Sequence, residues 1–145
     1  EGRCGQNVAW LVSGVHAYAE DHGGSLPPAD SWLEVIGPYL DDEKGPQGTT
    51  GNCRYAYNAA LSGRKLADLR HPGRLVAVFE TTPWGDMEDP WAAAGNQQQL
   101  SENPGHLEGD YYGFADGDHR WLARRRLPDG AWGKEPEADW VVWEP

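Results

Sequence analysis

One amphipathic helix at the beginning of the sequence restricts the folds that are open to this chain. Apolar residues recur there at steps of three and four positions, at Cys4, Val8, Leu11, Val12, Val15, Tyr18 and Ala19. We expect a helix from about residue 3 to residue 22, because Gly23-Gly24 suits a helix end and Pro27-Pro28 prevents a restart. Such a helix gains most of its stability by packing, so its apolar stripe should lie against a sheet.

The rest of the sequence supplies a second short helix and several strands. Ser31 is a candidate N-cap for a helix that Gly37-Pro38 weakens at its end. Candidate strands are residues 54–58, 75–81, 110–115, 119–123 and 139–143. The polar segment 41–52 indicates a surface loop, and residues 82–104, rich in Pro, Gly, Gln and Trp, show little periodicity.

Together these elements predict an α+β fold in a single domain spanning residues 1–145. A chain of 145 residues can bury one modest core. The expected architecture is a long N-terminal amphipathic helix packed on an antiparallel β-sheet, with a long irregular loop region.

Asp116-Gly117, between two aromatic-rich strand candidates, predicts a two-residue hairpin turn. A turn of this kind brings aromatic residues together in two pairs: Phe114 with His119 and Tyr112 with Trp121. Because side chains alternate along a strand, these residues should share one face, and we expect that face to pack beneath the helix.

Nine residues separate His106 from Asp116. One interpretation makes His106 a metal ligand or catalytic base that Asp116 orients. The other makes His106 a structural latch that fastens the preceding loop to the turn. We favour the latch, because one His and one Asp are too few for a structural zinc and no nucleophile accompanies them. The sequence also lacks common hydrolase motifs, so we do not expect an enzyme.

Twelve basic and 23 acidic side chains give the chain a formal net charge of −11, which argues against nucleic acid as a partner. The only basic cluster, residues 124–126, is expected to be a solvated strand end. Two acidic groups could supply calcium ligands: Asp110, Asp116 and Asp118, or Asp86, Glu88 and Asp89. Neither group matches an EF-hand, so no cofactor is expected and calcium is left open.

The two cysteines and eight tryptophans each allow two interpretations. Cys4 and Cys53 are free thiols in a reducing compartment or one disulfide in an oxidising one. Trp84 and Trp91, in the segment without periodicity, either anchor the core or stack on a ligand such as a polysaccharide.

Two signatures at opposite ends of the chain resemble one protein family. Residues 4–28 (CGQNVAWLVSGVHAYAEDHGGSLPP) and the spacing of His106 from Asp116-Gly117 are similar to the prepilin-processing-associated H-x9-DG family of type IV pilin and type II secretion pseudopilin proteins. Residues 32–40 (WLEVIGPYL), 55–61 (YAYNAAL) and 75–80 (LVAVFE) resemble words of the same family, so the likeness covers most of the chain.

The resemblance implies a pilin-like fold and a structural role. The chain would be the soluble head of a subunit that assembles with other pilin or pseudopilin subunits into a type IV pilus or a type II secretion pseudopilus. The expected alternative is an extracellular polysaccharide-binding module that uses Trp84 and Trp91.

The resemblance also implies an extracytoplasmic location, in the periplasm or in a cell-surface filament, which favours a Cys4–Cys53 disulfide. The 145 residues contain no apolar run long enough to span a membrane. We therefore expect an apolar helix before residue 1 that anchors the precursor in the inner membrane and makes its only membrane contact.

Overall fold

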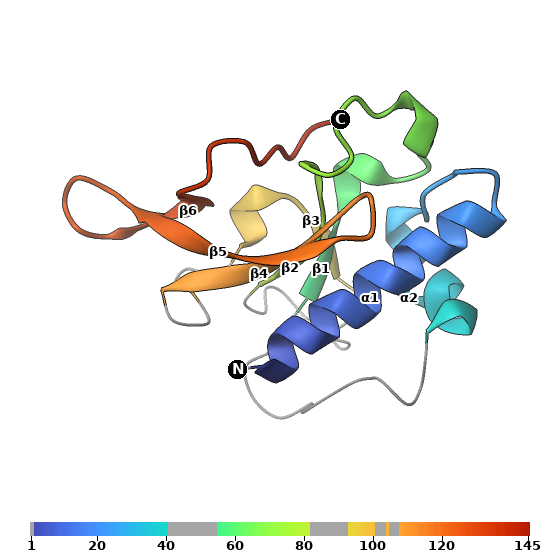
Figure 1. The fold of residues 1–145 in the computed structure, drawn as a ribbon, viewed down its shortest axis with the longest axis horizontal. Coiled ribbons are helices and arrows are strands. Elements are labelled where there is room, and N and C mark those ends of the chain that lie inside the picture. Colours follow the sequence, from blue (N-terminus) through green and yellow to red (C-terminus); the bar gives the residue numbers. More distant parts are fainter. Residues whose placement is uncertain (1, 41–54, 82–92, 101–103, 105–107) are drawn as a thin grey trace.

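The structure, a computed structural model, describes residues 2–40, 55–81, 93–100, 104 and 108–145. Helix α1 (Gly2–Asp21) crosses one face of a six-stranded sheet, and the short helix α2 (Trp32–Ile36) lies beside it (Figure 1). Short 3₁₀ helices occupy Ala29–Ser31, Gly37–Tyr39, Ala59–Leu61, Leu66–Asp68 and Gln97–Gln99. None of the described helices is long and apolar enough to cross a membrane.

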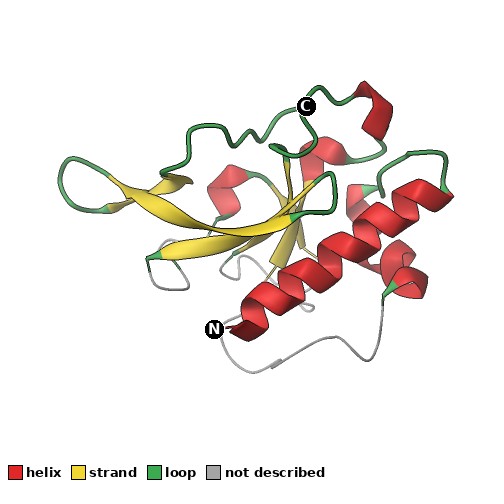
Figure 2. Cartoon of the chain, viewed as in Figure 1, coloured by secondary structure: helices red, strands yellow, loops and turns green. Residues whose placement is uncertain are grey.

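The sheet has the spatial order β3-β1-β2-β4-β5-β6. Its strands are β1 (Tyr55–Asn58), β2 (Val76–Glu80), β3 (Ala93–Gly95), β4 (Gly109–Phe114), β5 (His119–Arg126) and β6 (Trp132–Pro136). Neighbouring strands are antiparallel except for β1 and β3, which run parallel. The sheet curls, and the β5–β6 hairpin extends beyond the rest of it (Figure 2).

The predicted fold class, a pilin-like α+β fold with a helix on an antiparallel sheet and a long irregular loop region, is wrong. The sheet is mixed and curls like a half-barrel, more of the described residues lie in strands than in α-helices, and α1 is the only long helix of the described part of the chain. Strand β3 lies within the segment 82–104 that was expected to be irregular, and it places Ala94 opposite Tyr57. Its small residues show no period, and the pairing with β1 overrides their weak strand preference.

The C-terminal region also differs from the prediction. Residues 139–143, predicted to be a strand, make only an isolated bridge between Leu75 and Val142. The strand lies earlier, in β6, which was not predicted from the sequence. At the other end, α1 ends close to the predicted position, where Gly23 and Gly24 have φ of 66° and 86°.

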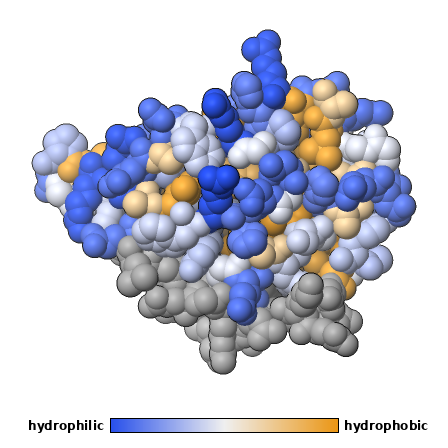
Figure 3. All heavy atoms as spheres, in the orientation of Figure 1, coloured by the Kyte–Doolittle hydropathy of each residue, from blue (hydrophilic) through white to orange (hydrophobic). Residues whose placement is uncertain are grey.

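The core has two parts, one on each face of the sheet. Between α1, α2 and the sheet lie Val8, Leu11, Val12, Val15, Ala19, Leu26, Trp32, Ile36, Tyr55, Tyr57, Leu61, Leu69, Leu75, Ala77, Val78 and Ala115. On the opposite face, the C-terminal segment covers Ala56, Val76, Phe79, Leu100, Tyr112 and Phe114. The face of the molecule drawn in Figure 3 is mainly hydrophilic, with apolar residues in separate small patches.

Candidate functional site

The Asp116-Gly117 turn has three residues, not the predicted two. Phe114 N donates to Asp118 O (2.8 Å), Gly117 N donates to Phe114 O (2.9 Å), and Gly117 has a φ of 93°. This pattern is a hairpin turn in which the glycine forms a bulge. The predicted register is therefore wrong by one residue: Gly113 lies opposite His119, and Tyr112 lies opposite Arg120.

The shift in register changes which side chains of β5 share a face with those of β4. Because opposite residues of paired strands lie on the same face, His119 and Trp121 lie on the face of Gly113 and Tyr111, not on that of Tyr112 and Phe114. Tyr112 and Phe114 pack on the face away from α1, where their rings lie 6.4 Å from Trp143 and 5.7 Å from Trp140, respectively. The prediction of an aromatic face beneath the helix is wrong, since Tyr111 and Gly113 occupy that position.

Glycines let α1 lie very close to β4. A Cβ atom added to Gly113 would be 2.8 Å from Val12 Cβ, and one added to Gly5 would be 2.6 Å from the Tyr111 ring. Separations below 3 Å do not occur between real side chains and their neighbours, so only glycine fits either position without movement. One of these glycines belongs to α1 and the other to β4, and together the two close contacts set the position of the helix on the strand.

The turn itself rests against α1. A Cβ atom on Gly117 would lie 3.2 Å from His16 Cγ, and Asp116 Oδ2 is 2.9 Å from where a Cβ of Gly73 would be. The other oxygen of Asp116 accepts a hydrogen bond from Asp118 N (2.9 Å). Asp116 and Gly117 are thus held between α1 and the segment that leads into β2. His106 lies outside the described residues, so its role as a latch stays a prediction.

A second turn, between β5 and β6, has the same construction. Leu127 N donates to Ala131 O (2.7 Å), and Gly130 N donates to Leu127 O (2.9 Å). The Asp129 side chain accepts from Ala131 N (2.9 Å), and Gly130 has a φ of 88°. Pro128-Asp129-Gly130 is a turn sequence in its own right, and it was the signal from which β6 could have been found.

A buried ion pair joins β4 to β5. Both oxygens of Asp110 accept hydrogen bonds of 2.9 Å from the Arg124 guanidinium, and both side chains are 0 % exposed. Arg124 also donates to Gly133 O (3.4 Å) in β6. The expectation that residues 124–126 form a solvated strand end fails for Arg124, whose side chain points inward to Asp110, while Arg125 and Arg126 stay exposed.

The described structure does not bring Asp110, Asp116 and Asp118 together as calcium ligands. Asp110 is bound to Arg124, and Asp118 lies at the turn beside Arg120 (3.2 Å). A hydrogen bond from Arg120 lowers the pKa of Asp118. In the described ranges, no group of three or more His, Cys, Asp or Glu side chains is placed to hold a metal ion.

Several predicted site residues cannot be placed. Cys53, Trp84, Trp91 and the second acidic group (Asp86, Glu88 and Asp89) lie outside the described residues, as does the side chain of Cys4. The Cys4–Cys53 disulfide and the stacking role of Trp84 and Trp91 therefore remain predictions.

Three tyrosines of the sheet are buried. The pKa of Tyr55, Tyr57 and Tyr112 is raised above that of an exposed tyrosine, mainly because burial disfavours the charged phenolate. Tyr55 Oη accepts a hydrogen bond from Asn7 Nδ2 (3.1 Å), and Tyr57 Oη donates to Pro27 O (2.9 Å). These two bonds attach α1 and its exit loop to β1.

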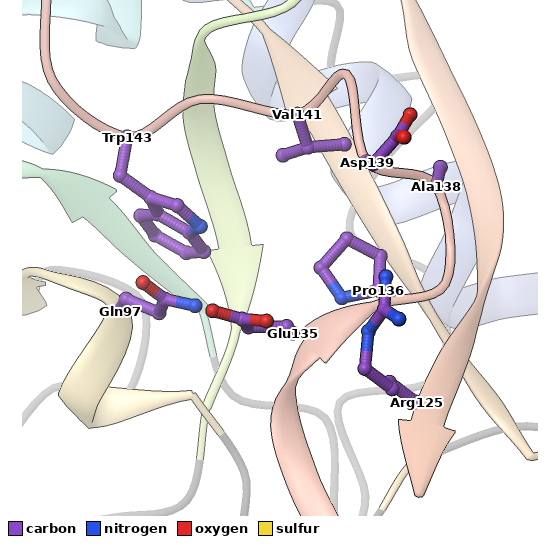
Figure 4. A pocket seen from close by; sticks show the side chains of 8 residues that line it. All are labelled: Gln97, Arg125, Glu135, Pro136, Ala138, Asp139, Val141 and Trp143. Atoms are coloured by element: carbon purple, nitrogen blue, oxygen red, sulfur yellow. The ribbon is translucent and has the colours of Figure 1, made fainter.

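A pocket lies on the face of the sheet opposite α1 and was not predicted from the sequence. The pocket has a volume of about 210 Å³ and lies between β5, β6, the Gln97–Gln99 turn and the C-terminal segment (Figure 4). Its lining residues are Gln97, Arg125, Glu135, Pro136, Ala138, Asp139, Val141 and Trp143. No spacing in the sequence relates these residues, because the fold brings them together from three separate segments.

Comparisons of the chain with protein-family models, with curated proteins and with solved structures found no match.

Proposed function

We propose that this chain is the soluble head of a pilin or pseudopilin, a structural subunit of a type IV pilus or a type II secretion pseudopilus. One observation supports the proposal: the Asp116-Gly117 part of the second signature packs against the helix formed by the first. Residues 4–28 form most of α1 and its exit, and the Asp116-Gly117 turn rests on α1 at His16. The likeness therefore concerns one connected unit of helix and hairpin.

The contacts of this unit suit a subunit that transmits force through a helix. Tyr111 lies against Gly5, Gly113 against Val12, and Gly117 against His16. At a rise of 1.5 Å per residue, these contacts are distributed along about 16 Å of α1. In a filament, a pull along the helix would reach the sheet through the β4–β5 hairpin. The function proposed is packing and surface presentation, without bond chemistry.

Fractionation of the cells that produce the protein tests this proposal. We expect the encoded precursor to be cut by a prepilin peptidase, and the processed form to appear in sheared filaments or to cross-link to other pilin-like subunits. Deletion of the peptidase should abolish both results. A precursor that stays uncut in the presence of the peptidase, and that cross-links to no such subunit, would contradict the proposal.

A matched pair of variants tests the coupling between helix and hairpin. Gly113→Ala places a Cβ against Val12, whereas Gly37→Ala adds a Cβ with nothing within 4 Å. Gly113→Ala should lower the amount of processed protein in the filament fraction, and Gly37→Ala should leave it unchanged. Equal incorporation of the two variants would argue against a mechanical role for this contact.

A further inference from the structure

The pocket next to Trp143 has firmly held walls. Lys134 and the Gln97–Gln99 turn exchange hydrogen bonds, from Gln97 Nε2 to Lys134 O (2.8 Å) and from Lys134 Nζ to Gln98 O (2.9 Å). Arg125 Nη2 donates to Glu137 O (3.1 Å), which ties β5 to the segment after β6. A pocket whose walls are already fixed loses little conformational freedom when a ligand binds.

Trp143 is also held from the sheet side. Asn58 Nδ2 donates to both Trp143 O and Val76 O at 2.8 Å, and Val76 N donates to Val142 O at 3.0 Å. The indole packs edge-to-face on Phe79, with ring centroids 4.9 Å apart. Its Nε1 is buried and is without a hydrogen-bond partner among the described residues. The pocket is thus bounded by an anchored indole that still has an unused donor.

The lining combines one apolar side with donors and acceptors. Trp143, Val141 and Pro136 supply the apolar surface. Arg125 supplies donors, since its bond to Glu137 uses one of five guanidinium N–H groups, and Glu135 supplies a carboxylate acceptor. In Figure 4 the Glu135 carboxylate points toward the side of the pocket formed by Trp143 and Gln97, whereas the Asp139 carboxylate points away.

This chemistry selects against simple ions. An anion would meet the carboxylate of Glu135, and a cation would meet the guanidinium of Arg125. A neutral ring with apolar C–H faces and a rim of hydroxyl groups matches all parts of the lining, because hydroxyls both donate and accept. The volume of about 210 Å³ lies below the roughly 300–1,000 Å³ of pockets for drug-sized ligands. It suits a single ring.

We infer that this pocket binds one sugar ring, a neutral hexopyranose or the terminal unit of a glycan. The ring would pack on Trp143 and Val141, with its hydroxyls on Glu135, Arg125 and the Gln97 amide oxygen. This inference does not depend on the proposed assembly into filaments, since a pilin head and an unrelated binding domain could both carry such a pocket.

The test is NMR titration of the protein with the methyl glycosides of glucose, galactose and N-acetylglucosamine, up to about 50 mM. For a ligand with so few atoms we expect a dissociation constant on the order of millimolar. At least one glycoside should shift the Trp143 indole and the Glu135 and Val141 amides saturably. Absence of saturable shifts with all three, or binding of tetramethylammonium in their place, would overturn the inference.

Two variants locate the site. Glu135→Ala removes the carboxylate that points into the pocket and should weaken binding by about tenfold or more. Glu137→Ala is the matched control, because Glu137 is an exposed carboxylate two residues away that does not line the pocket. The NMR spectra must show that both variants are folded. Equal affinity of Glu135→Ala and Glu137→Ala for the glycoside would then assign the shifts to another surface and overturn the inference.

Discussion

At the residue scale, Arg124 and Asp110 form a fully buried ion pair with a high desolvation cost. Two charges that are 0 % exposed have lost their hydration, and their mutual hydrogen bonds, together with the bond to Gly133 O, offset that loss. Removing one partner leaves the other charge buried without its counter-charge. The pair therefore fixes β4, β5 and β6 in one arrangement, even where it adds little net stability.

Arg124→Met should lower the free energy of unfolding by about 3–5 kcal/mol, because the Asp110 carboxylate would stay buried without the guanidinium that neutralises it. The double variant Asp110→Leu/Arg124→Met should be more stable than either single variant. Urea unfolding measures all three. Arg120→Met is the control, since its ion pair with Asp118 is exposed and should contribute at most about 1 kcal/mol. A double variant less stable than both single variants would contradict this account.

Gly113→Ala should destabilise the protein by about 1–3 kcal/mol, because its Cβ would overlap Val12 and push α1 away from β4. Gly37→Ala is its control: Gly37 has φ −46° and ψ −48°, and apart from its chain neighbours no atom lies within 4 Å of the added Cβ. That variant should cost less than Gly113→Ala, since its added Cβ meets only the ring of the following Pro38. Thermal unfolding of the two variants measures the difference, and equal melting temperatures would show that α1 can move without cost.

At the element scale, the two Asp-Gly turns offer an internal comparison. Both have the same hydrogen bonds and a glycine with φ near 90°, but only Gly117 has a neighbour, His16, while Gly130 faces open space. A substitution at each glycine thus separates backbone strain from packing against α1.

Gly117→Ala and Gly130→Ala should each lose about 1–2 kcal/mol from the left-handed backbone alone. Gly117→Ala should lose about 1 kcal/mol more, because its Cβ meets His16. Adding His16→Ala to Gly117→Ala should remove this excess. Chemical unfolding of the wild type, the two single variants and the double variant measures this excess. An equal loss of stability at both glycines would mean that packing of the turn against α1 contributes nothing.

The elements differ in how well the sequence predicts them. α1 could be located because its apolar period and the Gly23-Gly24 stop are local signals. The hairpin could be located, but its register could not, because Asp-Gly occurs in both two-residue and three-residue turns. The three-residue turn is recognised only from its backbone hydrogen bonds, from Phe114 N to Asp118 O and from Gly117 N to Phe114 O. β3 could not be predicted, since Ala-Ala-Gly becomes a strand only by pairing with β1, a contact about 40 residues away in sequence.

At the scale of the whole molecule, the sheet separates two surfaces with different proposed roles. The α1 face carries residues 4–28 and the Asp116-Gly117 turn, from which the family resemblance is drawn, and the opposite face carries the pocket beside Trp143. The pocket was not predictable, because Arg125, Glu135 and Trp143 are placed together by the curl of the sheet and by the C-terminal segment that crosses it. The curl itself follows from pairings that no local pattern specifies.

Alkaline pH should unfold the protein cooperatively. Tyr55, Tyr57 and Tyr112 have a raised pKa in the folded state, so above about pH 10 the unfolded chain releases protons that the folded chain retains. Stability is then complete below pH 10 and falls above it, by up to about 4 kcal/mol per pH unit when all three tyrosines contribute. Tyrosinate absorbance and circular dichroism should change together. Ionisation of all six tyrosines with the fold intact would contradict the burial described here.

The two matching turns have a consequence for the order in which the chain folds. Each closes within five residues, so the β4–β5–β6 meander needs only short loops, whereas α1 must find β4 across about 100 residues. The meander should therefore form first and serve as the nucleus on which α1 docks. In stopped-flow experiments, Gly130→Ala should mainly slow folding, and Gly113→Ala should mainly speed unfolding.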